Sequence, residues 1–263
     1  MSYETILYDV TDQVATITFN RPDKLNAFND QMIKESTQAL KTAARDPNAR
    51  AIVLTGHGRG FSSGQDLMEA AATAGNPDHA LGDHLRRTYH VLINQMLATE
   101  KPIIGVINGI AAGIGMSIAL ATDLRLMSDQ AAFTLGFSKI GLVPDGGANW
   151  ILTRMIGYPR AYEIALTSEK ITAVQAYDWG MINKVVPHDQ LAEIATAYAR
   201  QIATGPTLAF GLTKRAMLRG LNQTLAENLD YEAHLQTLAG RSEDCREGIM
   251  SFIEKRPVNF QGK

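Results

Sequence analysis

The sequence of 263 residues contains one cysteine, Cys245, and carries a formal net charge of only −2. A single cysteine excludes an intrachain disulfide, and neither it nor the six histidines show metal-ligand spacing, so no metal site is expected. The small net charge gives no electrostatic signature of binding to nucleic acid or an anionic membrane, although a local basic patch could hold phosphates. No apolar run approaches 18 residues, and the first residues show no basic segment followed by an apolar one. We therefore expect no nucleic-acid partner, no membrane span and a cytoplasmic location.

Short strand-like runs alternate with helix-like runs along the first two thirds of the chain. Val14 to Phe19 alternates apolar and polar residues and forms a hairpin with residues 3–9. Strands are expected near 3–9, 13–19, 51–55, 103–107, 123–127, 131–135 and 182–186, and helices near 30–45, 84–98, 147–157, 159–167, 172–179 and 189–203. Residues 68–82 are rich in alanine and glycine and are expected to be mobile. Repeated strand-loop-helix units predict an α/β fold with ligand loops at the carboxyl ends of the strands.

The last third of the chain is helical. Gly205-Pro206 separates residues 1–204, the expected core, from residues 205–263, where three helices are expected near 207–219, 223–239 and 243–255. Their apolar stripes find little room in an α/β core. We interpret residues 205–263 as an oligomerisation region; the alternative is that these helices pack against one another.

A glycine-rich stretch at residues 108–117 follows the strand at 103–107. Its glycines permit a sharp turn, and the first amides of the helix that follows have no intrahelical partner, so the stretch could bind an oxygen that carries negative charge. It is not a dinucleotide fingerprint or a Walker loop, because the third glycine and the Gly-Lys-Ser/Thr are absent. The simpler explanation is close packing of a helix on a strand.

A second glycine-rich strand-to-helix loop at residues 56–67 adds to that evidence. Two such loops could each present a backbone N–H to one carbonyl oxygen and so form an oxyanion hole. That geometry suits chemistry that passes through an enolate.

Four motifs in order, and a closing segment at 251–256, resemble the crotonase (enoyl-CoA hydratase/isomerase) superfamily. The motifs are Arg21-Pro22-(x)3-Asn26-Ala27, Phe61-Ser62-Ser63-Gly64-Gln65-Asp66-Leu67, Asn108-Gly109-(x)3-Gly113-Ile114-Gly115 and Gly141-Leu142-Val143-Pro144-Asp145-Gly146-Gly147. The resemblance covers essentially the whole chain. It implies a spiral of repeated ββα units, a C-terminal helical trimerisation region, and a homotrimer or a hexamer built as a dimer of trimers.

The same resemblance implies an acyl-CoA substrate and no further cofactor. The backbone amides of Gln65 and Ile114 would polarise the thioester carbonyl. Coenzyme A would lie along Lys24, Leu25, Ala27, Ser63, Asp66, Leu67 and Gly113, and Phe252 and Lys255 would reach the coenzyme A of a neighbouring subunit. Without the resemblance, Lys255 reads as a solvated surface charge.

The acids and bases of the site depart from the hydratase pattern. Hydratases of this superfamily use two glutamates, and here Ser117 and Phe137 occupy those positions. A serine hydroxyl cannot act unaided as a general base near neutral pH, and phenylalanine has no titratable group. The sequence therefore argues against simple water addition.

Asp145 is the remaining candidate for proton transfer, although an aspartate just before a helix is also an ordinary N-cap. Residues 137–147 resemble the branch of ring-1,2-epoxyphenylacetyl-CoA isomerases of phenylacetate degradation, and so does the segment that begins at Leu238. That resemblance implies an isomerase in which one aspartate moves a proton to shift a double bond, or assists opening of a ring epoxide to a seven-membered oxepin. Apolar neighbours such as Phe137 would raise the pKa of Asp145 and favour the exchange.

Three other functions stay open. An enoyl-CoA hydratase would have to work without the two glutamates. In a 4-chlorobenzoyl-CoA dehalogenase-like enzyme Asp145 would be the nucleophile and His90 the base, but Phe137 lacks the expected N–H and His90 could simply lie on a helix face. A catalytically silent CoA-binding protein would bind acyl-CoA without turnover. Tyr89 and Met116 could line the acyl pocket or belong to the core.

Overall fold

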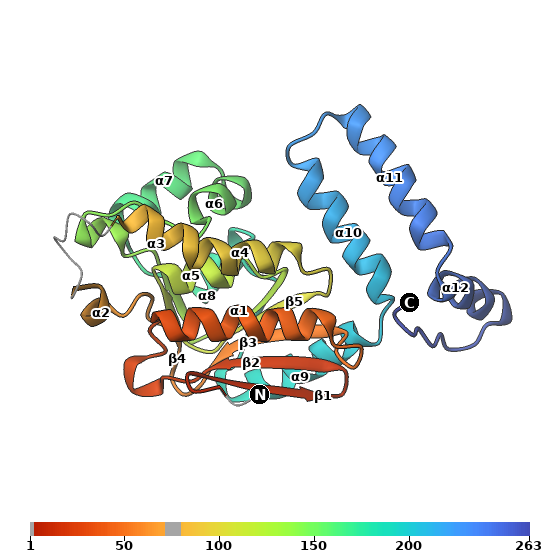
Figure 1. Ribbon diagram of the computed structural model, residues 1–263, viewed down its shortest axis with the longest axis horizontal. Coiled ribbons are helices and arrows are strands. Elements are labelled where there is room, and N and C mark those ends of the chain that lie inside the picture. The colour runs from red at the N-terminus through yellow and green to blue at the C-terminus, as the bar shows by residue number, and fades with distance from the viewer. Residues whose placement is uncertain (1–2, 72–79) are drawn as a thin grey trace.

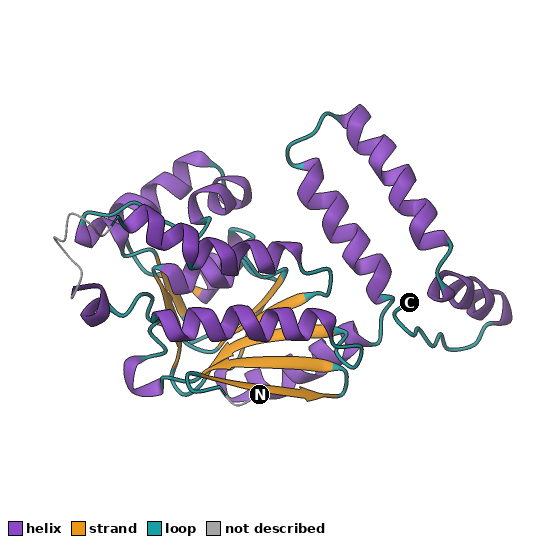
Figure 2. Ribbon diagram, viewed as in Figure 1, coloured by secondary structure: helices purple, strands orange, loops and turns teal. Residues whose placement is uncertain are grey.

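Two β-sheets wrapped by helices form the body of the molecule (Figures 1 and 2). The computed structural model describes residues 3–71 and 80–263. A six-stranded sheet has the order β1-β2-β3-β5-β7-β10, and a four-stranded sheet has the order β4-β6-β8-β9. The strands are β1 Ile6–Thr11, β2 Val14–Phe19, β3 Ala51–Gly56, β4 Gly60–Ser62, β5 Ile103–Ile107, β6 Ile110–Ala112, β7 Leu124–Ser128, β8 Ala132–Thr134, β9 Ile171–Thr172 and β10 Lys184–Val186.

The large sheet grows from the expected hairpin. β1 and β2 pair antiparallel through a turn in which Asp12 and Gln13 both have positive φ, and β2, β3, β5, β7 and β10 then pair in parallel. Parallel neighbours need a crossover connection, which the helices supply. The carboxyl ends of these strands therefore lie along one edge, where both glycine-rich loops emerge.

The small sheet corrects the prediction that residues 56–67 and 108–117 are loops. β4 lies within the first segment and β6 within the second, and the two strands pair in parallel. Each has only three residues, too few for an alternating pattern to be visible in the sequence. Their pairing brings the two glycine-rich segments together. The sequence alone indicated only that the two segments could converge.

The helices follow the predicted spans with one break. They are α1 Asp30–Arg45, α2 Leu67–Ala71, α3 Leu81–Arg87, α4 Tyr89–Ala98, α5 Ile114–Leu120, α6 Ala148–Ile156, α7 Tyr158–Thr167, α8 Ala173–Asp178, α9 Leu191–Ala203, α10 Thr207–Gly220, α11 Leu225–Gly240 and α12 Glu243–Glu254. The helix expected over 84–98 is wrong as one element, because Thr88 has φ −121° and ψ −91° and separates α3 from α4. The expectation of a mobile loop over 68–82 falls partly outside the described residues, and α2 and α3 occupy its ends. Asn29 caps α1 as predicted, because its side chain accepts a hydrogen bond from the Met32 amide at 3.0 Å.

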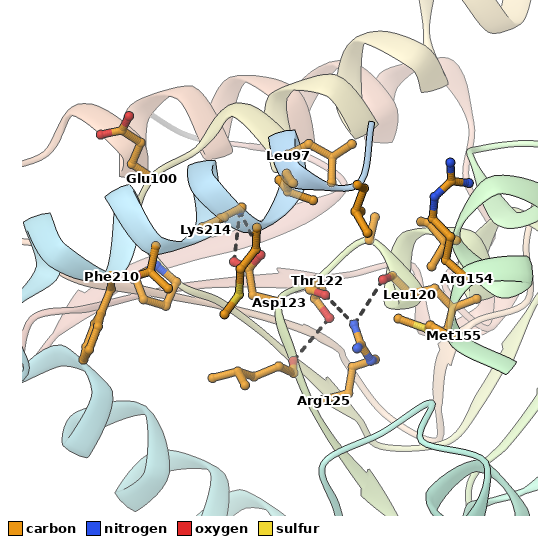
Figure 3. A pocket seen from close by; sticks show the side chains of 18 of the residues that line it. Leu97, Glu100, Leu120, Thr122, Asp123, Arg125, Arg154, Met155, Phe210 and Lys214 are labelled. Carbon is orange, nitrogen blue, oxygen red and sulfur yellow. Dashed lines mark hydrogen bonds and ion pairs between the residues drawn. The ribbon is translucent and has the colours of Figure 1, made fainter. Parts of the chain in front are cut away.

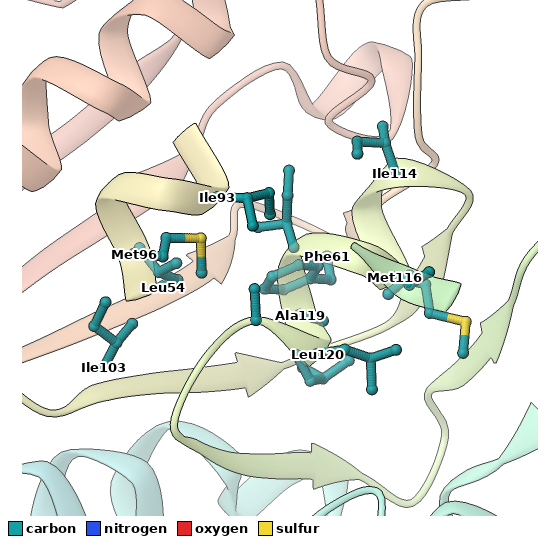
Figure 4. Packing of buried hydrophobic residues seen from close by; sticks show 14 of the residues in the cluster. Leu54, Phe61, Ile93, Met96, Ile103, Ile114, Met116, Ala119 and Leu120 are labelled. Atoms are coloured by element: carbon teal, nitrogen blue, oxygen red, sulfur yellow. The ribbon is translucent and has the colours of Figure 1, made fainter. Parts of the chain in front are cut away.

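Both faces of the large sheet are buried, because alternate strand residues enter two different clusters. Ile52 and Leu54 of β3 pack in the cluster that contains α1, while Ala51 and Val53 pack against α9 on the other face. The first cluster continues through Phe61 of β4 to α5 (Figure 4). The α5 helix is therefore fixed by the core along its whole length, and all seven of its residues are buried.

The three C-terminal helices extend away from the body (Figure 1). Many of their apolar side chains are exposed: Met217, Leu221, Leu225, Leu229, Leu238, Ile249, Met250, Phe252 and Ile253. The final residues return to the start of α10, where the Arg50 guanidinium donates to the backbone oxygens of Phe260 and Gly205. The helices are thus anchored at their base and present apolar surface elsewhere.

A partly buried ion pair joins α10 to the body (Figure 3). The Lys214 ammonium lies 3.0 Å from the Asp123 carboxylate and donates to the Met96 backbone oxygen at 2.8 Å. Burial lowers the pKa of Lys214 and raises that of Asp123, so desolvation outweighs the attraction between the two charges for each partner. Both residues line an apolar cavity of about 530 Å³.

Candidate active site

The two glycine-rich segments meet at Gly64 and Gly113. Gly64 has φ +99° and Gly113 has φ +52°, a region that side-chain-bearing residues rarely adopt. A Cβ on Gly64 would lie 2.9 Å from the Ala112 backbone oxygen and 3.7 Å from the Gly113 Cα. Only glycine permits this approach, which sets the next residues of both segments, Gln65 and Ile114, beside one pocket.

The backbone amides of Gln65 and Ile114 have no acceptor in the described chain. The Gly113 and Asp66 amides on either side donate to Thr134 and Phe28 oxygens, but these two do not donate. Ile114 is the first residue of α5, where an amide has no intrahelical partner. Two free N–H groups beside a pocket are what an oxyanion hole requires.

The pocket beside these amides has a volume of about 550 Å³ and mostly apolar walls. The lining residues come from the start of α1, the segments at 63–65 and 112–114, the region from α2 to α4, and residues 135–145. The apolar members are Leu67, Leu81, Leu85, Tyr89, Ile114, Leu135, Phe137, Ile140, Leu142 and Val143, and the acidic members are Asp30, Glu69 and Asp145. A pocket of this size, with apolar walls and a few polar groups, is typical of a small-molecule site.

Asp145 does not act as a helix cap. Gly147, with φ +81°, is the N-cap residue of α6, and Asp145 contributes only its backbone oxygen to the Ala148 amide. Its Oδ1 atom is buried and has no hydrogen-bond partner among the described residues. Burial raises the pKa of Asp145 from 3.8 to about 6. A carboxyl group of this kind, in a pocket and near neutrality, is suited to proton transfer.

The Asp145 segment is packed directly on α5. Ser117 donates a hydrogen bond from its hydroxyl to the Asp145 backbone oxygen at 2.9 Å. Gly146 has φ +59°, and a Cβ there would lie 2.3 Å from Ile114 Cδ1 and 2.9 Å from Ser117 Cβ. Phe137 lines the pocket with Asp145. The two positions where hydratases were expected to carry glutamates therefore hold a hydroxyl bound to the Asp145 backbone and an apolar wall.

Sequence reasoning gave little weight to Tyr89 and His84, and the structure places both in the pocket. The Tyr89 hydroxyl donates to the Gln65 side-chain oxygen. Burial, together with the Asp145 carboxylate, raises the pKa of Tyr89 well above 10, so its hydroxyl stays protonated. His84 Nε2 lies 3.6 Å from an Asp30 carboxylate oxygen. Tyr89 reads in sequence as an ordinary core position at the start of α4, whereas Met116 is fully buried and is not among the residues that line the pocket.

Asn26 holds the loop that was expected to contact coenzyme A. Its side-chain amide donates to the backbone oxygens of His57 and Gly60 at 3.0 and 2.8 Å, and its oxygen accepts from the Arg21 amide at 2.9 Å. Lys24 is exposed beside it, Leu25 is partly buried, and Ala27 is buried. The Ser63 hydroxyl donates to the Lys24 oxygen at 3.1 Å. The loop is therefore shaped before any ligand binds.

Asp66, which was expected to contact coenzyme A, has structural contacts of its own. It forms an ion pair with Arg21 at 2.9 Å and accepts from the Met68 amide at 3.2 Å. Burial alone would raise the pKa of Asp66, but the Arg21 and Met68 hydrogen bonds outweigh it and lower that pKa. Leu67 next to it is exposed.

Phe252 and Lys255 lie apart from the pocket. Phe252 is 85% exposed on α12, and Lys255 follows that helix with φ +54°. In Figure 1 α12 lies at the opposite end of the molecule from α2 and α3. His90 is exposed on α4 and is not among the residues that line the pocket. The described part of the chain contains neither a cluster of His, Cys, Asp or Glu side chains that could hold a metal ion nor a helix long and apolar enough to cross a bilayer.

Comparison with known proteins agrees with this geometry. Residues 9–263 match the family model described as enoyl-CoA hydratase/isomerase. The chain therefore belongs to the enoyl-CoA hydratase/isomerase family and is an acyl-CoA enzyme of the crotonase superfamily, with the crotonase fold predicted from its motifs. A putative enoyl-CoA hydratase/isomerase from Mycobacterium abscessus superposes with a TM-score of 0.93 at 34% identity, covering 98% of this chain and 100% of that one.

Its relatives carry different activities in their names. The chain is 43% identical over 260 residues to the 1,2-epoxyphenylacetyl-CoA isomerase of Escherichia coli K12, covering 99% of each. It is also 43% identical over 263 residues to a probable enoyl-CoA hydratase of Rhodobacter capsulatus, covering all of both chains. A 4-chlorobenzoyl coenzyme A dehalogenase of Arthrobacter is 37% identical over 225 residues, covering 84% of this chain and 80% of the relative.

Proposed function

We propose that this protein is an acyl-CoA isomerase in which Asp145 alone carries the proton. The observation that supports this most is the buried, unpartnered Asp145 carboxyl group in the pocket that Gln65 and Ile114 also line. Ser117 and Phe137 leave no second acid or base at the two positions where hydratases have glutamates. One carboxylate beside an oxyanion hole is sufficient for transfer of a proton between two carbon atoms.

The proposed reaction begins with a 3-enoyl thioester whose carbonyl oxygen accepts hydrogen bonds from the Gln65 and Ile114 amides. The Asp145 carboxylate removes a proton from C2, the electron pair of that C–H bond forms a C1–C2 double bond, and the carbonyl π pair moves to the thioester oxygen. The product is a dienolate with double bonds at C1–C2 and C3–C4, and the C2–C3 double bond forms when C4 is protonated. The two amides stabilise that negative charge, and each such donor contributes about 2.7–4 kcal/mol in comparable sites. Asp145 then returns the proton to C4, which restores the thioester carbonyl and gives the 2-enoyl isomer.

The pKa of Asp145 fits this exchange. A pKa of about 6 leaves the group mainly ionised at neutral pH, yet basic enough to accept a proton and acidic enough to return it. A carboxylate with an ordinary pKa of 3.8 would be a weaker base by about two units. No hydrogen bond within the described residues occupies its Oδ1 atom, and Asp145 lines the pocket.

The acyl group that we propose is bulky and apolar, with a phenylacetyl-derived ring 1,2-epoxide as the first candidate. Its support is the wall of Leu135, Phe137 and Ile140, and the name of the Escherichia coli relative. For such a substrate Asp145 would assist epoxide opening and rearrangement to the oxepin. The same site and mechanism would also serve straight-chain unsaturated acyl-CoA substrates.

Two other activities have less support. Hydration needs a second acid or base, and the Ser117 hydroxyl is bound to the Asp145 backbone instead. Aryl displacement needs a base near Asp145, and His90 is exposed and outside the set of lining residues. The free amides and the carboxyl group with a raised pKa also argue against a silent CoA-binding protein.

We propose a homotrimer, or a dimer of trimers, as the assembled form. The support is the row of exposed apolar residues on α10 to α12 and the distance in Figure 1 between α12, which carries Phe252, and the pocket region. In that assembly Phe252 and Lys255 would contact the coenzyme A of a neighbour.

The test measures conversion of a 3-enoyl-CoA to its 2-enoyl isomer, with hydration of crotonyl-CoA in parallel. Asp145→Asn should lower isomerisation by about 100- to 10,000-fold, since it removes the only proton carrier. Glu69→Gln, which changes another carboxylate of the same pocket, should stay within about threefold of wild type. Strong hydration by the wild type, or isomerisation that survives Asp145→Asn, would refute the proposal. Loss of isomerisation in the variant would justify trying the aromatic epoxide next.

A further inference from the structure

We propose that Ser117 is a positioning residue that fixes Asp145 relative to the oxyanion amides. The inference rests on the proposed function, because it concerns how the Asp145 carboxyl group is held. The inference goes beyond the proposed function because it gives a role to the Ser117 side chain, which is not among the residues that line the pocket. The supporting contacts all lie between α5 and residues 145–147.

No hydrogen bond fixes the Asp145 carboxyl group at Oδ1. Its position therefore depends on the backbone that carries it. That backbone accepts two hydrogen bonds at the Asp145 oxygen, from the Ser117 hydroxyl at 2.9 Å and from the Ala148 amide at 3.1 Å. The Ala148 bond lies within the turn before α6 and cannot tie that turn to another element. The Ser117 bond can, because Ser117 belongs to α5.

The α5 helix also carries one of the two oxyanion amides. Ile114 is its first residue and Ser117 stands one turn later, so both act from one rigid segment. Ser117 is fully buried, and its hydroxyl has Gly113 as its other neighbouring acceptor, at 3.4 Å. Gly146 presses against Ile114 and Ser117 so closely that a Cβ would not fit. The same helix therefore sets where the thioester oxygen is bound and where the base stands.

A displacement of about 1 Å in such a constellation typically costs about 100-fold in rate. Ser117→Ala removes the hydroxyl and leaves the helix intact, because alanine is a good helix former. We expect kcat to fall about 10- to 100-fold while KM changes by less than about threefold, since the walls that bind the acyl group are unchanged. Ser117→Cys keeps most of the volume but offers only a weak S–H donor, so its kcat should lie between those of wild type and Ser117→Ala.

The pH profile gives a readout that a merely structural role would not move. If the Asp145 segment loosens, its carboxyl group gains water, and the acid limb of kcat against pH should move below its wild-type position. Ser128→Ala is the matched control: Ser128 is fully buried, its hydroxyl lies 2.9 Å from His188 Nδ1, and it is not among the residues that line the pocket. That variant should lose stability without changing kcat or the pH profile.

The inference is wrong if Ser117→Ala keeps the wild-type kcat and pH profile. It is also wrong if Ser117→Ala loses activity while Ser117→Cys keeps the wild-type kcat, because the effect would then come from packing volume and not from the hydrogen bond. Asp145→Asn, assayed in the same preparation series, separates the two ideas. If that variant remains active, the proposed function fails and takes the inference with it. If it is inactive while Ser117→Ala behaves as wild type, the inference fails alone.

Discussion

Replacing Asp145 with asparagine should stabilise the folded protein while it removes the activity. The wild-type carboxyl group is buried without a partner at Oδ1, and burial raises its pKa from 3.8 to about 6. A group with a raised folded-state pKa contributes stability that is complete below its unfolded pKa and is lost as pH rises through the folded value. Ionised Asp145 therefore costs folding free energy at neutral pH, and the uncharged variant avoids that cost.

The size of the effect follows from the pKa difference. A shift of about two units corresponds to about 3 kcal/mol at pH 8, where the group is ionised in both states. At pH 5 the same linkage gives about half of that value, and below the unfolded pKa it vanishes. Asparagine adds a penalty of its own, because its buried amide also lacks partners, but that penalty does not depend on pH.

The informative quantity is therefore the difference in unfolding free energy between variant and wild type as a function of pH. Urea titrations should show it growing in favour of Asp145→Asn by about 1.5 kcal/mol between pH 5 and pH 8, with most of the rise below pH 7. Glu69→Gln serves as the control, since Glu69 is exposed. A difference that is flat across this range, or that shrinks as pH rises, would refute the assignment of a buried, uncompensated carboxyl group to Asp145.

Three further changes test other parts of the structure. Tyr89→Phe removes the donor to the Gln65 side chain and should lower kcat/KM by about threefold to tenfold, measured with the 3-enoyl-CoA assay. Asn26→Ala removes three hydrogen bonds that hold the loop expected to contact coenzyme A, and it should cost about 2–4 kcal/mol of unfolding free energy in urea titrations; a cost below 1 kcal/mol would contradict its structural role. Lys214→Met leaves Asp123 charged without its partner and should cost about 3 kcal/mol at pH 7 but less at pH 5, where Asp123 takes up a proton more readily.

The sequence predicted the long elements of the fold well because they carry complete periodic patterns. The strand β5 is an unbroken apolar run, β3 is apolar from Ala51 to Leu54, and α1 shows both its cap at Asn29 and a repeating buried face. It missed β4 and β6, since three residues contain less than two alternations. The sequence also predicted α3 and α4 as one helix, because a single threonine at position 88 is not a helix-breaking signal.

The site was predictable where backbone geometry dictates residue type. Gly64 and Gly113 marked the two segments that approach each other, because positive φ and close approach leave little choice but glycine. The assignment of the Gln65 and Ile114 amides came from the family resemblance. Asp145 was ambiguous, since a cap and a proton carrier look alike before a helix. The structure distinguishes these two roles, because Gly147 is the N-cap residue of α6 and the Asp145 carboxyl group is therefore not used as a cap. Tyr89 could not be singled out, because a buried tyrosine beside a pocket has the same pattern as one in a core.

The pairing of Gly64 with Gly113 has a consequence for how this enzyme tolerates change over evolutionary time. The donors that we propose there are peptide N–H groups, so among single substitutions at 65 or 114 only proline would delete one. Other substitutions there would act through the side chains, by changing the Tyr89–Gln65 hydrogen bond or the packing of Ile114 against Gly146. The positions most sensitive to substitution are then Gly64 and Gly113, which contribute no side-chain functional group. A screen of random variants should therefore find positions 65 and 114 more tolerant than the positions before them, glycines 64 and 113.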